Sequence, residues 1–211
     1  MDNDVSSVTP KTTRKGRQRR RLIGGAVAAV VVVAAVVVGG TWQHSKAGTS
    51  GALGVHACPV IDPTTHLPSI APVAEVNWAN CNLTGADLRG AYLFMAALNG
   101  ATLSGANLTD AVLTGAVLTG VQSGAIVGTV TLPTGWIIVD GYLVGPGANL
   151  TSALLTGALL TGVDLTGANL KGATLTGATM TGVIYSYTIC PNGTFSSNRT
   201  PQSCTGQGGG L

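Results

Sequence analysis

The sequence predicts an all-β solenoid that follows a single N-terminal transmembrane helix. A leucine returns at every fifth residue from Leu83 to Leu118, and a small residue, nearly always alanine, stands two positions before each of them. Residues 22–40 form an uncharged apolar run behind a basic tail. The chain has 211 residues, of which only 9% are charged and 4% aromatic, so we expect a thin core.

The five-residue spacing fits neither regular secondary structure. On an α-helix each step of five would carry the leucines about 140° further round the axis, and on a flat strand an odd spacing alternates between faces. All the leucines can face one axis only if the backbone turns a corner every five residues, so that each pentapeptide forms one wall. Four walls make a coil of about 20 residues. Residues one coil apart should stack at about 4.8 Å, with Asp87 over Asn107 and Asn149 over Asn169.

The repeat register occupies two blocks, residues 76–121 and residues 148–185. In the first block the central residues are Leu83, Leu88, Leu93, Leu98, Leu103, Leu108, Leu113 and Leu118, preceded by the small residues Cys81, Ala86, Ala91, Ala96, Ala101, Ala106, Ala111 and Ala116. The second block repeats this pairing from Ala148 and Leu150 to Val183 and Tyr185. The leucines should fill the axis, at roughly 1.5 to 3 kcal/mol each on burial, with alanine where the walls converge.

Three segments carry the fullest form of the pattern: residues 86–90 (Ala-Asp-Leu-Arg-Gly), residues 106–110 (Ala-Asn-Leu-Thr-Asp) and residues 168–172 (Ala-Asn-Leu-Lys-Gly). They resemble the pentapeptide-repeat family. The resemblance implies that the solenoid is a right-handed quadrilateral β-helix. It also brings an alternative function, since some members of the family imitate duplex DNA and protect type II topoisomerases. The matching walls here carry mainly threonine, with too few carboxylates to imitate phosphates.

Residues 22–40 are predicted to cross the cytoplasmic membrane. No residue of this run carries a charge. At about 1.5 Å rise per residue, a helix of this length just spans a hydrocarbon core of about 30 Å. Residues 1–21 carry seven basic side chains, which favour a cytoplasmic N-terminus and put the repeats outside. The alternative is cleavage of the apolar run and secretion, and Arg19 and Arg20 also fit a twin-arginine export signal.

Four cysteines flank the repeats: Cys58, Cys81, Cys190 and Cys204. Of the three possible pairings, we favour joining each cysteine to its neighbour in sequence, because the intervening coils hold the two ends roughly 15 to 20 Å apart. The competing hypothesis is a zinc site made of His56, Cys58, His66 and Cys81. Its spacing lacks a Cys-x-x-Cys or His-x-x-x-His unit, so we expect disulfides and no metal.

Residues 122–147 interrupt the register and are predicted to form an inserted hairpin or flap. They mix turn residues with the densest aromatic and apolar run outside the membrane segment. Residues 41–75 are expected to form a linker and N-terminal cap. Residues 186–211 should form a C-terminal cap with a glycine-rich tail, because a solenoid needs both of its open ends covered.

Apolar side chains at outward positions predict an interaction patch. Its members are Tyr92, Phe94, Met95 and Val112 on the walls, with Trp136 and Tyr142 on the flap. An exposed apolar patch usually has a partner. We expect the flap, which also carries Ile138, to cover the wall residues within the same molecule. The alternative is a binding surface for another molecule, which the outward Leu154 and Leu159 would extend.

Catalytic chemistry is not indicated by the sequence. The histidines His44, His56 and His66 all precede the repeats, and the acidic residues Asp87, Asp110 and Asp164 stand singly on the walls. No phosphate-binding loop appears, so no cofactor is expected. Basic residues gather in the N-terminal tail, so we expect no nucleic-acid partner. The sequence therefore favours a non-enzymatic scaffold that binds a protein or cell-envelope component. The alternatives are a DNA mimic and an enzyme with a site under the flap.

Overall fold

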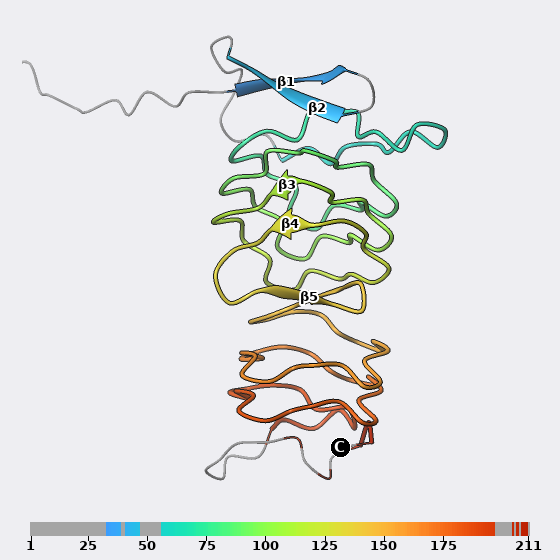
Figure 1. Cartoon of the computed structure of the whole chain (residues 1–211), viewed down its shortest axis with the longest axis vertical. Helices are drawn as coiled ribbons and strands as arrows, with labels where there is room; N and C mark the ends of the chain where they lie inside the picture. The colour runs from blue at the N-terminus through green and yellow to red at the C-terminus, as the bar shows by residue number, and fades with distance from the viewer. Residues whose placement is uncertain are drawn as a thin grey trace, which may run out of the picture. The chain divides into compact units, whose positions relative to one another are not determined.

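The computed structural model describes Val33–Val38, Thr41–Lys46, residues 56–196, residue 204, residue 206 and residues 208–210 (Figure 1). Strand β1 (Val33–Val38) pairs antiparallel with β2 (Thr41–Lys46). Strand β3 (Ala111–Val112) pairs parallel with β4 (Val130–Thr131), and β5 (Ile137–Val139) pairs antiparallel with β6 (Tyr142–Val144). The remaining pairing consists of single bridges, which are parallel between the short walls and antiparallel at Ile61–Pro68 and Ile189–Phe195 in the two caps.

The predicted membrane segment lies mostly outside the described residues. Of residues 22–40 the structure describes only Val33–Val38, which it gives as strand β1 and not as a helix. The basic tail, residues 1–21, is outside the described part as well. In the ranges that the structure describes, no helix is long and apolar enough to cross a membrane. The transmembrane helix stays a prediction.

The repeats form the predicted four-walled coil. Parallel bridges join Asp87 to Asn107 and Asn149 to Asn169, the two stacks expected from the sequence. The backbone links neighbouring coils in both directions: Leu83 N–H donates to the Thr102 carbonyl at 2.8 Å, and Thr102 N–H donates to the Cys81 carbonyl at 2.9 Å. Each short wall is therefore held by the coils on either side of it.

Two hydrophobic clusters fill the axis, one for each block. The first contains every central leucine from Leu83 to Leu118, and Trp78 takes the equivalent place at the start of the first coil. The second begins at Val144 and ends on the half-cystines of the C-terminal cap. The leucines of both clusters are at most 1% exposed, so burial contributes close to the full roughly 1.5 to 3 kcal/mol for each.

The asparagines and aspartates at outward positions hold the corners. Their Oδ1 atoms accept hydrogen bonds from the backbone N–H two residues further on, as in Asn107 to Thr109 at 3.1 Å and Asp164 to Thr166 at 2.8 Å. This local bond closes a tight turn, which explains why these residue types recur one position before the central leucine. Gly105, at a corner, adopts φ of 69°, a left-handed conformation that glycine reaches without strain.

The first block continues past its predicted end at residue 121. Gln122 bridges Thr102, and Val127 bridges Asn107. Leucine is already missing from the central place at Ser123, which is buried, and Gly128 occupies the next central place. The coil departs from the 20-residue period after Val127, since Val112 pairs with Thr131. The stack resumes where Gln122 bridges Asn149, which lies further along the chain than one regular coil would place it. The extra residues lie in the segment that carries the β5–β6 hairpin.

The hairpin supplies the side chain that the repeat lacks at Gly145. This glycine stands at the central position of its wall, and a Cβ there would lie 2.5 Å from Cδ2 of Trp136. Trp136 packs against both hydrophobic clusters. Tyr142 Oη accepts a hydrogen bond from Leu154 N–H at 3.2 Å, and Ser123 Oγ accepts one from the hairpin. The hairpin therefore joins the two blocks, with the indole in place of a leucine.

Replacing Gly145 with alanine tests this packing. The added methyl group would overlap the indole of Trp136, so G145A should destabilise the full-length chain by about 1 to 3 kcal/mol in urea unfolding followed by circular dichroism. The loss should be smaller in a W136L background, where the smaller side chain leaves room for the methyl group. An equal loss of stability from G145A in the parent and W136L backgrounds would contradict the packing of Trp136 over Gly145.

Candidate functional site

Two disulfides close the ends of the solenoid. Cys58 is joined to Cys81, with the Cα atoms 5.2 Å apart, and Cys190 is joined to Cys204, with the Cα atoms 5.4 Å apart. This is the pairing that the sequence favours. Cys81 fills the small-residue position of the wall after Trp78 and is 1% exposed, whereas Cys58 lies exposed in the segment before the repeats. The first disulfide thus ties the N-terminal cap to the repeats, and closing a loop of this size stabilises by about 3 kcal/mol.

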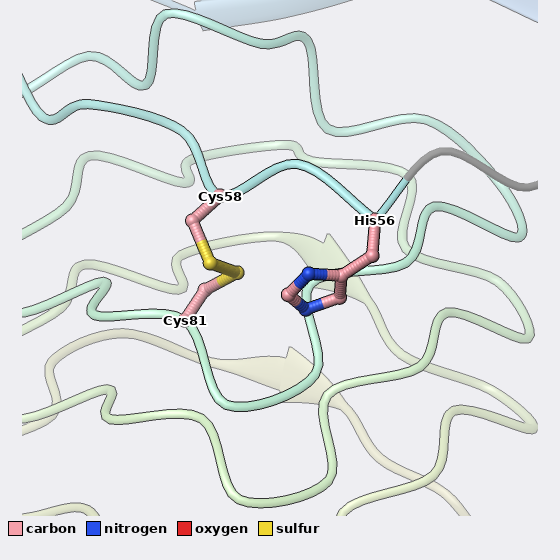
Figure 2. Close-up of side chains that lie close together, drawn as sticks. All are labelled: His56, Cys58 and Cys81. Atoms are coloured by element: carbon pink, nitrogen blue, oxygen red, sulfur yellow. A yellow bond between two sulfur atoms is a disulfide. The ribbon is translucent and has the colours of Figure 1, made fainter.

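His56 lies beside the first disulfide (Figure 2). A ring nitrogen of His56 and the sulfur atoms of Cys58 and Cys81 lie within 4.8 Å of one another. His56 Nε2 is 2.5 Å from the carbonyl oxygen of Ala79. The structure therefore brings together three of the four residues of the alternative zinc hypothesis, and His66 is placed elsewhere. A cysteine binds a metal ion as its thiolate, and neither sulfur of a disulfide is a thiolate.

His66 lies at an open depression of about 440 Å³ on the first two coils. The lining residues are Thr65, His66, Gly85, Asp87, Arg89, Gly105 and Asn107. Asp87 N–H donates to the His66 carbonyl at 2.8 Å, which fastens the cap segment to the wall. Arg89 donates two hydrogen bonds to the carboxylate of Asp87, from Nε to Oδ1 at 2.8 Å and from Nη2 to Oδ2 at 2.6 Å. The two opposite charges pair with each other in the lining of the depression.

The Arg89 hydrogen bond holds the pKa of Asp87 below its usual range, against the opposing effect of burial. Arg89 is 41% exposed and Asp87 13% exposed, so solvent weakens the interaction. The arrangement is that of a structural ion pair on one wall, because both groups belong to a single pentapeptide.

The six residues of the predicted patch lie on the repeat walls and in the segment of the β5–β6 hairpin. Tyr92 and Phe94 stack with ring centroids 6.0 Å apart, and Tyr92 bridges Val112 as the coil period requires. Beyond Val112 the next residue of the stack is Thr131 of β4. Trp136 and Tyr142 instead contact Gly145 and Gly124 respectively. Cover of the wall residues by the hairpin stays a prediction.

The most exposed apolar residues lie mainly outside the predicted patch. Leu154 is 67% exposed and Leu159 74% exposed, compared with 54% for Met95. A second group, at the last coil, was missed from the sequence and consists of Ile184, Tyr187 and Phe195, which are 51%, 77% and 66% exposed. The signal that could have found Ile184 is an isoleucine in the outward position, which asparagine, aspartate or threonine fills in many other walls.

A family model described as pentapeptide repeats matches eight copies in this chain, at residues 74–96, 94–122 and 147–183. The repeat region belongs to the pentapeptide-repeat family. Its fold is accordingly a right-handed quadrilateral β-helix, and the matched ranges lie on either side of the β5–β6 hairpin. No curated protein sequence matches the chain.

Several solved pentapeptide-repeat proteins are similar to this chain. HetL from the cyanobacterium Nostoc sp. strain PCC 7120, a protein involved in the regulation of heterocyst differentiation, is 28% identical, with a TM-score of 0.24. The match covers 58% of this chain and 41% of HetL. Rfr23 from the cyanobacterium Cyanothece 51142 is 28% identical over 55% of this chain and 56% of its own, with a TM-score of 0.22.

QnrB1, a plasmid-mediated fluoroquinolone resistance protein, is 20% identical, with a TM-score of 0.26. The match covers 56% of this chain and 65% of QnrB1. This chain thus spans less than two thirds of each of these three proteins.

The ion pair of the pentapeptide-repeat domain predicts a pH dependence. Because the pKa of Asp87 is lowered in the folded state, its contribution to stability is present above the unfolded value of about 3.9 and disappears as the pH falls through the folded value. D87N should therefore flatten the loss of stability below about pH 4, measured as the urea midpoint across the acid range. R89Q should flatten it similarly. Unchanged acid profiles in both variants would contradict the assignment.

Proposed function

We propose that this protein is a non-enzymatic scaffold, anchored in or exported across the cytoplasmic membrane, whose repeat domain binds a protein or cell-envelope component. The observation that carries the proposal is the exposure of Leu154 and Leu159, at 67% and 74%, on a solenoid whose leucines otherwise fill the axis. Folding does not explain these two side chains, because the core is complete without them. Contact with a binding partner would explain their exposure.

The geometry of the repeats makes the exposure of these two leucines specific to one coil. Leu154 bridges Thr174 and Leu159 bridges Thr179, so threonine fills the same outward position one coil further on. The two leucines are five residues apart and stand on consecutive walls. Clustered exposed apolar groups are typical of interaction surfaces, whereas single ones are common on any protein.

Location outside the cytoplasm is supported by the sequence and by the cysteines. The basic tail precedes an apolar run of membrane-spanning length, which favours the repeats on the outer side. Both cysteine pairs form disulfides, which persist in oxidising compartments such as the periplasm or cell surface.

A scaffold also fits the acidic residues better than a DNA mimic does. A mimic of duplex DNA presents rows of free carboxylates in place of phosphates. Here the carboxylate of Asp87 is held by Arg89, and its neighbours along the same stack are Asn107 and Val127. The stack therefore loses its negative charge after one coil.

Site-specific crosslinking in intact cells tests both parts of the proposal. A photo-reactive amino acid replaces either Leu154 or Asn82 in the full-length chain. Cells are irradiated and then treated with external protease before lysis. We expect an adduct from position 154 and at least about tenfold less from position 82, since Asn82 is an exposed outward residue of the first block, several coils away from the two leucines. External protease should cleave the repeat-domain adduct in unbroken cells.

Two results would overturn the proposal in separate ways. Equal adduct yields from the two positions would contradict a binding surface at the two leucines, because Asn82 is exposed like Leu154 but lies in the other block. A repeat domain that resists external protease in intact cells but is cut after lysis would remove the outer location.

A further inference from the structure

The N-terminal cap places three metal-ligating residue types at one point. His56, Cys58 and Cys81 each offer one atom, and these atoms lie within 4.8 Å of one another (Figure 2). In a tetrahedral zinc site with Zn–S bonds of about 2.3 Å, neighbouring sulfur ligands stand about 3.8 Å apart. The spread of the three atoms is therefore close to what one ion needs, once the bond between the sulfurs is opened.

The hydrogen bond of His56 prepares the ring for ligation. The carbonyl oxygen of Ala79 can only accept, so Nε2 of His56 carries the proton that it donates at 2.5 Å. Neutral imidazole then has its lone pair on Nδ1. Metal-binding histidines commonly donate their second ring N–H to a backbone carbonyl or a carboxylate, which fixes the tautomer and the orientation of the ring. Figure 2 shows the ring of His56 turned toward the two sulfur atoms.

We propose that reduction of the Cys58–Cys81 disulfide converts this cap into a binding site for one thiophilic metal ion of the zinc class, held by His56, Cys58 and Cys81. A dithiol reductant supplies two electrons and two protons, breaks the S–S bond and is itself oxidised to a disulfide. The two thiols then lose their protons to solvent as they bind Zn²⁺. Water takes the fourth position, since His56 and Cys58 are exposed.

The disulfide and the metal ion are alternative crosslinks between Cys58 and Cys81. Cys58 lies on the segment before the first coil, and Cys81 lies on a wall of that coil. The disulfide and the metal ion would therefore each join the N-terminal cap to the repeats. Cys190 and Cys204 form the matched comparison, because in the described part of the chain no third cysteine, histidine or acidic group completes a cluster there. Reduction should therefore create a three-ligand site at the N-terminal cap only.

The test is a metal titration of the full-length chain carrying C190A and C204A, so that the N-terminal pair supplies the only thiols. The reduced protein is titrated with Zn²⁺ against a chromophoric chelator, and with Co²⁺ to detect a sulfur-to-metal charge-transfer band. We expect one equivalent of Zn²⁺ bound in the reduced state and none in the oxidised state. H56A should weaken binding by at least about tenfold, the loss typical of disturbing even an outer partner of a metal ligand.

H66A is the matched histidine control, because His66 lies at the depression on the first two coils and not beside the disulfide. Its zinc affinity should equal that of the parent protein. No zinc uptake on reduction, or equal affinity in H56A and H66A, would overturn the proposal. Should the double cysteine replacement fail to fold, the same comparison of H56A with H66A in the reduced chain with all four cysteines gives the answer.

Discussion

The structure depends on one constraint: every pentapeptide must turn its central residue and its small residue toward the axis while its backbone bonds to the coils on either side. Leu83 N–H, for example, donates to Thr102 of the next coil, and Thr102 N–H donates back to Cys81. Neither the buried leucine nor the backbone bonds would hold a five-residue wall alone. Stacking satisfies both together, which is why stability in such a fold comes from neighbouring coils.

The same constraint explains how the chain tolerates its interruption. The central places after Leu118 hold Ser123 and Gly128 instead of leucine, and a hairpin follows. Trp136 fills the space over Gly145 that a leucine would occupy. Backbone pairing across the interruption is restored on one wall, where Gln122 bridges Asn149. On the next wall the N–H of Leu154 donates to the side chain of Tyr142 instead of to a backbone carbonyl. The irregular coil thus keeps its core and loses some of its backbone ladder, and Leu154 and Leu159 emerge just beyond this point.

Features that depend on the period were predictable, and features that depend on long-range contacts were not. The four-walled coil and the stack of Asp87 on Asn107 follow from spacing alone. The continuation of the first block to Val127 was missed, because backbone bridges persist there without the leucine and alanine that mark the register. Trp136 approaches Gly145 through a hairpin whose path no pattern specifies. Likewise, Cys58 and Cys81 could be paired from position, whereas the orientation of His56 depends on the Ala79 carbonyl.

The central claim is that the two blocks of regular coils are joined through side chains of the hairpin and not by a continuous backbone ladder. Amide hydrogen exchange on the native full-length chain measures this most directly. The account predicts slow exchange at Leu103 and Leu170, whose N–H groups donate to backbone carbonyls of the next coil, and faster exchange at Leu154, whose partner is a tyrosine hydroxyl. Equal protection at the three amides would contradict it, because the ladder would then run unbroken through the hairpin.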